Sequence, residues 1–366
     1  MTAELAPPPG PAVGAGPDDR DNPIDPADPV GRVARLTFDD LAREASALRD
    51  RINRFRTALG RFFVAKQPVI DLMCVAAVAQ EPLLLVGPPG TAKSDLVIKF
   101  KDALNIPDGE YFEYLLTRFT EPSEVFGPID IAQLRAGRYL RRDRGKLPTA
   151  RLVFLDEIFK ANSAILNSLL TVINERKFYQ DGQPVPVKLR ILLAATNELP
   201  ENVELAALKD RFCLKAACRS VQDEHFVELI DAGTDAYTQR ELNQKPWVEG
   251  HASLEDFVKA HRWLTHVLAR RTIGPNGNEL RDRDLYCSDE LLRELRRVLK
   301  TLVREDGVFV SDRKIVKLYR LLRTHAWIVH GGAIERSDLR LLSYLGETRD
   351  EIDPLEDKVP RLLGLT

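Results

Sequence analysis

The sequence has little of several features that would narrow its class at once. Four cysteines stand in 366 residues, at Cys74, Cys213, Cys218 and Cys287. The one close pair among them lacks a second Cys or His pair to complete a zinc site, so we expect buried free thiols. No apolar run is long enough to span a bilayer, and no basic start precedes an apolar core near the N-terminus. We therefore expect a cytoplasmic chain without a membrane span.

Neither sign of charge is in excess. The chain has 53 basic and 55 acidic residues and a formal net charge of -2. The molecule as a whole therefore has no electrostatic attraction for nucleic acid or anionic lipid, and we expect no nucleic-acid partner. Apolar residues, in contrast, make up 44% of the composition. The chain is also long enough for two packed domains.

The N-terminal part differs in composition from the rest. Residues 1–35 consist largely of Pro, Gly, Ala and Asp. They have too few apolar side chains to offset the entropy of ordering, and they predict a disordered tail. Residues 38–60 then follow the apolar spacing of an amphipathic helix, with Phe38, Leu48 and Phe55 in its stripe.

Short apolar runs alternate with helical patterns between about residues 70 and 215. Four of the runs have the composition of strands, at residues 82–87, 111–116, 151–157 and 190–197. Near-continuous apolar strands separated by helices indicate a parallel sheet covered on both faces. Ligands of such sheets bind at the carboxyl ends of the strands, so we expect the chemistry in the loops that follow them.

Helical periodicity replaces the strand pattern beyond about residue 215. One apolar stripe begins after Ser288, and another helix begins after Ser311 and ends near Gly331–Gly332. Serine and glycine are typical of these two helix ends. The pattern predicts a separate all-α domain over residues 216–345. Residues 346–366 are charged and contain prolines, and they stay unassigned.

The first strand run is followed by GPPGTAKS, which has most of a phosphate-binding loop. In the pattern G-x-x-x-x-G-K-[ST], Gly87, Lys93 and Ser94 match, and Ala92 takes the place of the second glycine. The extra methyl group is tolerated if φ at Ala92 is negative, as in a turn that is already winding into a helix. The alternative is an ordinary strand-to-helix turn with a solvated lysine.

Two other strand runs end in residues that suit nucleotide chemistry. LVFLDE ends in Asp156 and Glu157. The first can hold Mg²⁺ together with the Ser94 hydroxyl, and the second can polarise an attacking water. LLAATN ends in Asn197, whose amide can orient that water. Acidic residues also cap helices and asparagine also begins turns, but three such strand ends in series favour a nucleotide site.

With these elements, the chain resembles the AAA+ ATPases, specifically the MoxR family and its RavA-like branch. The resemblance covers roughly residues 40–340 and rests on GPPGTAKS, EYLLTRFTEPSEVFGP, LVFLDEIFKANSAILNSLLTVINERKFYQDG, ATNELPE, ALKDRF and VSDRK. It implies a P-loop AAA+ αβα sandwich over residues 36–215, with a parallel five-stranded sheet of order 5-1-4-3-2. It further implies that the all-α domain is a lid and that the protein assembles into a ring, commonly a hexamer.

The resemblance also implies roles for single residues. Lys93, Glu157 and Asn197 would be catalytic, and Ser94 and Asp156 would hold Mg²⁺. The loop that binds ATP would comprise Gly87, Pro88, Pro89, Gly90, Thr91, Ala92, Lys93, Ser94 and Asp95.

Two arginines complete the implied site. Arg211 would be an arginine finger that acts on a neighbouring subunit, and Arg313 would be the second sensor, reading the γ-phosphate from the lid. The plainer interpretation of Arg211 is an ion pair with Asp210. That of Arg313 is a charge on the first turn of a helix, where the helix dipole mildly disfavours it.

Two insertions fit the same family. Residues 127–147 stand where this group carries an insertion in the second core helix, and residues 176–190 resemble the hairpin before the first sensor. Asp181–Gly182 is a strong signal for the turn of a hairpin between Tyr179 and Val185. In ring ATPases such hairpins project toward the pore or a bound partner. The alternative is a surface loop that carries charged residues and has no such contact.

The expected function is that of a MoxR-type ring ATPase that hydrolyses ATP with Mg²⁺ and remodels or activates a protein client. The resemblance adds a partner that contains a von Willebrand factor A domain. A nucleic-acid motor or loader is the alternative, and the charge balance argues against it. A scaffold that binds nucleotide without hydrolysing it is a third, disfavoured by the presence of Glu157 and Asn197. RavA-like proteins often carry a further module after the ATPase, whereas this sequence stops soon after the lid, so functions assigned to that module are not carried over.

Overall fold

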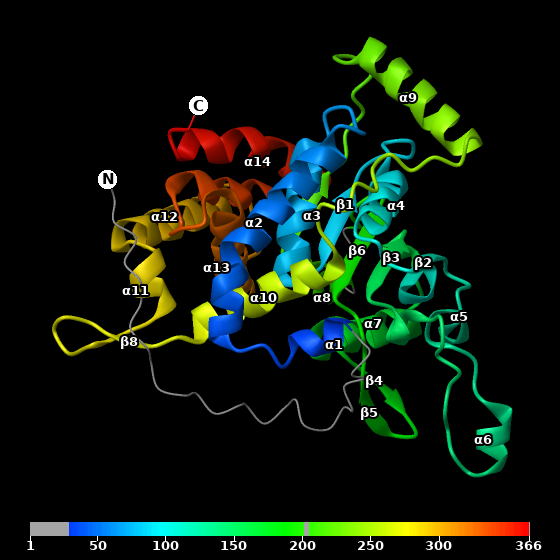
Figure 1. Cartoon of the computed structure of the whole chain (residues 1–366). Coiled ribbons are helices and arrows are strands. Elements are labelled where there is room, and N and C mark those ends of the chain that lie inside the picture. Colours follow the sequence, from blue (N-terminus) through cyan, green and yellow to red (C-terminus); the bar gives the residue numbers. More distant parts are fainter. Residues whose placement is uncertain (1–28, 201–204, 366) are drawn as a thin grey trace.

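The core of the protein is one parallel sheet. The computed structural model describes residues 29–200 and 205–365. The strands of the sheet are β1 (Leu83–Val86), β2 (Tyr111–Leu115), β3 (Leu152–Asp156), β6 (Ile191–Thr196) and β7 (Leu214–Ala217). They lie in the order β2-β3-β6-β1-β7, and each adjacent pair is parallel. This confirms the predicted order 5-1-4-3-2, read from the other edge, and brings the ends of β1, β3 and β6 together (Figure 1).

The two faces of the sheet belong to two apolar cores. In β1, Leu83 and Leu85 pack into one core, while Leu84 and Val86 pack into the other. Side chains alternate in this way along any strand, and burial on both faces explains the near-continuous apolar runs. The helices that cover the two cores are α3 (Gln67–Ala79) and α4 (Lys93–Ala103) on the first, and α7 (Ser163–Glu175) on the second.

The N-terminal helix ties the sheet to the C-terminal half. α2 (Phe38–Gly60) confirms the helix predicted for residues 38–60. Thr37 caps it by accepting a hydrogen bond from Asp40 N at 3.2 Å, while the Asp40 carboxylate accepts one from Thr37 N at 3.0 Å. The apolar stripe of α2 packs against α3 and α10 (Leu254–Ala269).

The last residues of the predicted tail are helical in part. Pro29–Val33 forms a short helix, α1, in which Val30 and Val33 are buried. The prediction of disorder through residue 35 is therefore wrong for its last residues, because the two valines are buried where α1 packs against α10. Residues 1–28 lie outside the described residues.

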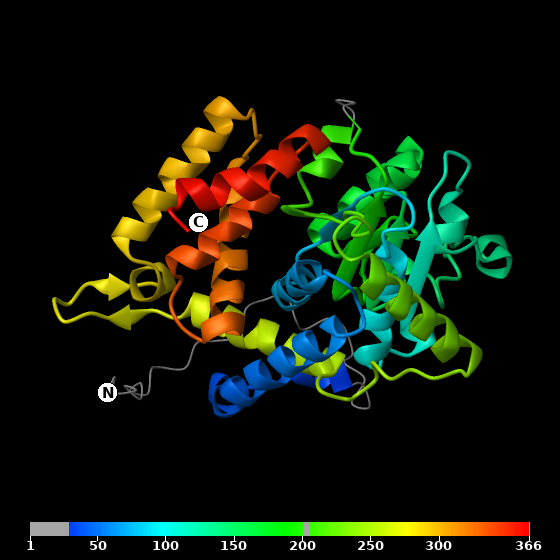
Figure 2. The same ribbon diagram turned by 90° about the horizontal axis from the view of Figure 1, so that it is seen from above.

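The C-terminal half is helical, as predicted (Figure 2). Ser288 and Ser311 cap two of its helices by accepting hydrogen bonds from Leu291 N and Lys314 N. A small ladder of β8 (Thr272–Ile273) with β9 (Glu279–Leu280) interrupts the all-α pattern. The helices are α9 (Phe226–Glu241), α10, α11 (Asp282–Tyr286), α12 (Asp289–Glu305), α13 (Asp312–His330), the 3₁₀ helix η5 (Arg336–Tyr344) and α14 (Arg349–Leu362).

Both boundaries of the helical half differ from the prediction. The sheet continues to Ala217, so it passes the expected limit at residue 215. The unassigned segment 346–366 contains α14, whose Leu355 and Val359 are buried. Pro354 and Pro360 lie inside this helix, and because proline disfavours helix interiors they hid it from sequence analysis.

Two excursions leave the sheet domain at the lower edge of Figure 1. The first is residues 127–147 with α6 (Ile131–Arg135), and the second is the hairpin of β4 (Lys177–Gln180) and β5 (Gln183–Pro186). Asp181 and Gly182 form its turn with φ of 50° and 72°, which confirms the predicted two-residue turn. The remaining short elements are α5 (Pro122–Phe126), α8 (Ala206–Lys209), η1 (Asp108–Glu110), η2 (Leu147–Thr149) and η3 (Ile158–Lys160).

The structure bears on the state of the cysteines and on membrane-spanning helices. Cys74, Cys213, Cys218 and Cys287 are all buried free thiols, as predicted. Within residues 29–200 and 205–365, no helix combines the length and apolar character needed to cross a bilayer.

Candidate nucleotide-binding site

The loop between β1 and α4 has the backbone of a phosphate cradle. Gly87 begins it. No side chain fits at this position, because the residue that follows β7 lies so close that a Cβ would be 2.1 Å from the carbonyl oxygen of Cys218. Thr91 closes the turn by donating from Oγ1 to the Pro88 carbonyl at 2.8 Å. α4 then starts at Lys93, so its free N–H groups and the positive end of its dipole face the loop.

Ala92 is not in the conformation expected from the sequence. It has φ 65° and ψ 21°, in the left-handed region, whereas we expected a negative φ. The reason is geometric: the chain must reverse before α4, and Ala92 O already accepts the hydrogen bond from Leu96 N at 2.9 Å. A side chain in this region costs about 1–2 kcal/mol, which is why glycine occupies this place in the general pattern.

One polar network joins the ends of three adjacent strands. Lys93 Nζ donates to the carbonyls of Gly87 at 2.6 Å and Pro88 at 2.9 Å, and to Asn197 Oδ1 at 3.0 Å. The Asn197 amide in turn donates to Glu157 Oε1. Lys93 and Glu157 each expose only 7% of their surface. The three residues that the sequence placed at separate strand ends therefore form one hydrogen-bonded chain, with Asn197 between Lys93 and Glu157.

Glu157 has the backbone strain that is common at functional sites. Its φ is 51°, and such a conformation persists only where the surroundings impose it. Asp156 Oδ1 accepts a hydrogen bond from Glu157 N at 2.9 Å, which fixes the junction. Lys160 forms an ion pair with Glu157 Oε1 at 3.2 Å, a partner that sequence analysis missed.

The two residues predicted to hold Mg²⁺ offer the type of ligand atom that this ion prefers. Ser94 and Asp156 supply oxygen atoms, which are the ligands that Mg²⁺ prefers. Within the described residues, no group of three or more His, Cys, Asp or Glu side chains could hold a metal. A site with so few protein ligands suits Mg²⁺, which usually keeps waters and binds substrate phosphates.

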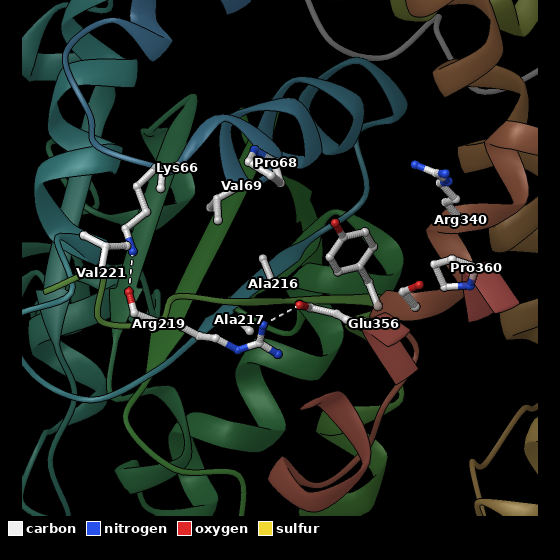
Figure 3. A pocket seen from close by; sticks show the side chains of 13 residues that line it. Lys66, Pro68, Val69, Ala216, Ala217, Arg219, Val221, Arg340, Glu356 and Pro360 are labelled. Carbon is white, nitrogen blue, oxygen red and sulfur yellow. Dashed lines mark hydrogen bonds and ion pairs between the residues drawn. The ribbon is translucent and has the colours of Figure 1, made fainter. Parts of the chain in front are cut away.

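A pocket of about 340 Å³ lies beside the start of the phosphate loop (Figure 3). Ala216 and Ala217 of β7 form part of its wall, and they pair with the last two residues of β1, Leu85 and Val86. Its other lining residues come from the start of α3, the segment after β7, η5 and α14, and include Lys66, Val69, Arg219, Val221, Tyr344 and Glu356.

The pocket has a polar rim tied across the two halves of the protein. Lys66 Nζ donates to the Arg219 carbonyl at 2.5 Å, and the Arg219 guanidinium pairs with Glu356 at 2.6 Å and Asp353 at 2.8 Å (Figure 3). Burial raises the pKa of Tyr344 and, against the pull of Arg219, that of Glu356. Sequence analysis missed this pocket, because its walls are far apart along the chain and no local motif marks them.

The two predicted arginines lie together. Arg211 forms an ion pair with Asp210 at 3.2 Å, and the other oxygen of Asp210 accepts a hydrogen bond from Ser311 Oγ, the cap of α13, at 3.0 Å. Burial lowers the pKa of Arg211, and the neighbouring charge of Arg313 lowers it further. Arg211 thus makes the plain ion pair of the alternative interpretation, while its Nε is buried with no partner among the described residues.

Arg313 is at the wrong end of β1 for the role predicted within its own chain. It lines a cavity of about 400 Å³ together with Glu81 and Pro82, which precede β1. The next turn of α13 is fixed there too, because Lys317 pairs with Glu81 at 2.8 Å. The phosphate loop follows the opposite end of the same strand. The expectation that Arg313 reads the γ-phosphate of its own subunit from the lid is therefore corrected.

Comparison with known proteins agrees with this geometry. A model of the MoxR domain in the MoxR-vWA-beta-propeller ternary systems matches residues 50–255. The chain belongs to the MoxR family of AAA+ ATPases. A model of an AAA lid domain matches residues 281–357 of this MoxR-family chain, which include α14 up to its middle.

Several relatives are similar over much of the chain. Two uncharacterized proteins of Methanocaldococcus jannaschii are 31% and 32% identical over 85% and 80% of this chain, and the matches span 73% and 70% of those proteins. A structural protein of Acidianus two-tailed virus is 36% identical over 59% of this chain and 33% of its own length. A crystal structure of a candidate ATPase from Cytophaga hutchinsonii has a TM-score of 0.64 at 14% identity, covering 89% of this chain and 97% of that one. The last similarity supports the fold alone.

Proposed function

We propose that this MoxR-family protein hydrolyses ATP at the end of β1, β3 and β6. The observation that carries the proposal is the network from Lys93 through Asn197 to Glu157. A buried ammonium that is bonded to two backbone carbonyls can exchange them for phosphate oxygens, because hydrogen bonds between two charged groups are stronger. Those carbonyls belong to Gly87 and Pro88 of the same loop.

The carboxylate of Glu157 would act as general base. It would accept a proton from the water that attacks the γ-phosphate, while the Asn197 amide holds that water in line. Mg²⁺, held by Ser94 and Asp156, would neutralise charge on the phosphates when bound. The pocket between β7, α3 and α14 lies beside the loop on the β7 side, and we assign it to the base and ribose of the nucleotide.

Arg211 and Arg313 would serve a neighbouring subunit. Both lie away from the phosphate loop of their own chain, so they can reach a γ-phosphate only across an interface. This arrangement supports the ring assembly that we propose, commonly a hexamer in this family. The charge of an arginine placed in this way lowers the barrier to phosphoryl transfer by stabilising charge in the transition state.

The energy of hydrolysis would be used to remodel or activate a protein client. The matching family model is named for systems that pair a MoxR domain with a vWA protein, and this supports a von Willebrand factor A domain partner. Membership of the RavA-like branch remains a proposal. The hairpin β4–β5 and residues 127–147 would contact the client, because they project from the sheet domain (Figure 1).

Two substitutions test the assignment. Glu157→Gln keeps the shape and removes the base, so ATP should bind and persist, whereas Lys93→Ala should weaken binding and abolish turnover. Phosphate release and the fluorescence of a labelled ATP analogue measure the two quantities. Glu290→Gln, at an exposed position on α12, is the matched control and should behave as wild type. Turnover by Glu157→Gln at the rate of wild type would refute the catalytic assignment.

A further inference from the structure

Residues 127–147 and the hairpin β4–β5 form a single unit rather than two separate loops. Asp181 N donates to the Tyr139 carbonyl at 2.8 Å, and Tyr139 N donates to the Asp181 carboxylate at 3.0 Å. Gln180 strengthens the junction, since its side chain accepts from Arg141 N at 3.1 Å and donates to Asp143 at 3.0 Å. We name this unit, residues 127–147 with 177–186, the basic platform.

The frame of the platform is fixed at its base. Asp130 N donates to the Leu140 carbonyl and Arg142 N to the Pro128 carbonyl, each at 2.8 Å. Gly127 is packed so closely that a Cβ would lie 2.1 Å from the Arg142 carbonyl oxygen. The side chains that the platform carries are therefore presented from a defined backbone and not from a loose loop.

The platform carries an excess of positive charge. Residues 127–147 contain six basic residues and two acidic ones, a net charge of +4. The acidic pair, Asp130 and Asp143, is engaged internally with Arg142 and Gln180. No ion pair within the described part of the chain includes the exposed Arg135, Arg138 or Arg144. The basic residues are Arg135, Arg138, Arg141, Arg142, Arg144 and Lys146.

Exposed apolar and aromatic side chains lie among these charges. Ile131 is 60% exposed, Tyr139 43% and Tyr179 57%. Tyr139 also stacks against the Arg141 guanidinium, whose carbon lies 5.8 Å from the ring centroid. A fixed surface with arginines and tyrosines together suits an extended acidic segment that carries prolines, because proline-rich chains dock on aromatic side chains and carboxylates pair with arginine.

The chain itself contains such a segment. Residues 1–28 include six acidic residues and one arginine, a net charge of -5, together with seven prolines. Five of the six acidic residues lie between residues 18 and 28, next to the start of α1 at Pro29. α1 lies in the lower half of the view in Figure 1, and the platform projects below it. At about 3.3 Å per residue, 28 residues reach about 90 Å when extended, so length does not prevent contact with the platform of the same or a neighbouring subunit.

We propose that residues 1–28 bind the basic platform and compete there with the client. The binding goes beyond the proposed ATPase and does not require it; only its consequence for the client rests on the proposed function. The arginines of the platform are exposed, so their attraction for the acidic segment should weaken with salt over the range in which the Debye length shrinks below about 10 Å. The segment would thereby act as a competitor built into the chain.

Binding of a free peptide to the full chain tests the proposal. The probe is a fluorescein-labelled synthetic peptide of residues 1–28, followed by anisotropy. The receptor is the full chain in which the five aspartates of residues 18–28 are changed to asparagine, so that its own segment no longer competes. Those positions are Asp18, Asp19, Asp21, Asp25 and Asp28.

Charge reversal then locates the site. In the receptor, Arg135→Glu, Arg138→Glu and Arg144→Glu together should weaken peptide binding by about tenfold or more, since three exposed pairs become repulsive. The matched control reverses three exposed basic residues on α12, with Arg296→Glu, Lys300→Glu and Arg304→Glu, and should bind like the receptor. A peptide whose five aspartates are replaced by lysine should bind the reversed platform better than the original peptide does. That restored binding shows that the loss came from charge and not from misfolding.

Three results would overturn the proposal. The first is equal peptide binding with and without the platform reversal, and the second is equal binding to the receptor and to wild type, whose own segment should compete. The third is a single-stranded oligonucleotide that binds the platform and is not displaced by the unlabelled peptide, which would assign the platform to nucleic acid. None of these results depends on ATP hydrolysis, so failure here is distinguishable from failure of the proposed ATPase.

Discussion

Glu347 offers a direct test of how the helical half is fixed to the sheet. Two lysines share its Oε1 atom, Lys215 of β7 at 3.1 Å and Lys314 of α13 at 2.5 Å, and both lysine side chains are 0% exposed. Burial lowers the pKa of Lys215 to about 8. Burial alone would raise the pKa of Glu347, but the two lysines lower it. One carboxylate therefore compensates two buried cations that come from different halves of the protein.

The substitution Glu347→Gln keeps the shape and one acceptor oxygen but removes the compensating charge. Loss of one partner from a buried ion pair costs about 3–5 kcal/mol, because the remaining charge is left in a poorly solvated place. Since glutamine still accepts a hydrogen bond, we expect the lower end, about 3 kcal/mol of the free energy of unfolding. Glu305→Gln is the control: Glu305 is 61% exposed and pairs with Lys358, so its loss should change stability by less than about 1 kcal/mol.

The pH dependence of this loss has a definite sign. Lys215 has a lower pKa in the folded protein than the ordinary value of about 10.4 that it has when unfolded. Between those two values the unfolded chain binds more protons, so stability rises with pH in that window. In Glu347→Gln the folded pKa of Lys215 should fall below the wild-type value of about 8, so the deficit relative to wild type should shrink as pH rises toward about 8 and change little above it. Urea unfolding followed by circular dichroism measures it. A deficit below about 1 kcal/mol at neutral pH, or one that grows with pH, would refute the reasoning.

Two further predictions concern the nucleotide site. Ala92→Gly should stabilise the protein by up to about 1 kcal/mol and change ATP affinity only a few fold, because the left-handed backbone is kept and only strain is removed; a large loss of affinity by calorimetry would contradict this. Arg211→Ala and Arg313→Ala should each bind ATP but turn it over about 10³-fold more slowly or worse. Mixing either with Glu157→Gln under subunit exchange should restore activity, and no recovery at any ratio, with exchange demonstrated, would exclude action on a neighbour.

The parts of the fold that sequence analysis predicted are those with local signals. The four strand runs and the helix of residues 38–60 each appear within about one residue of the expected limits, since each carries its own apolar pattern along the chain. Ser288 and Ser311 were recognisable as caps because their hydrogen bonds reach only three residues along the chain. β7 and α14 were missed. β7 is only four residues long. α14 contains two prolines, which disfavour a helix, and it forms because its apolar side chains are buried.

The candidate site divides in the same way. Lys93, Glu157 and Asn197 could be placed at strand ends, and parallel topology then brought those ends together. The conformation of Ala92 could not be inferred, because alanine gives no sign of a positive φ and the demand comes from the turn around it. The pocket lined by Lys66 and Tyr344 depends on four segments that meet only when the helical half packs against β7.

The position of Arg313 is the observation behind the proposal that it serves a neighbouring subunit. α13 begins beside Asp210 and Glu81, held by Ser311 and Lys317, so its first turn is fixed at the amino end of β1. β1 has four residues, and at about 3.3 Å each they separate that end from the phosphate loop by about 13 Å. Arg313, which lines the cavity at that end, therefore lies about the length of a strand from the phosphate loop of its own chain. If Arg211 and Arg313 act together on a neighbour, Asp210 helps to set how the next subunit must approach, because it pairs with Arg211 and accepts a hydrogen bond from Ser311 at the start of α13. The rigid attachment of α13 through Glu81 and Glu347 would then align the neighbour's site, and the packing between the two halves would contribute directly to catalysis.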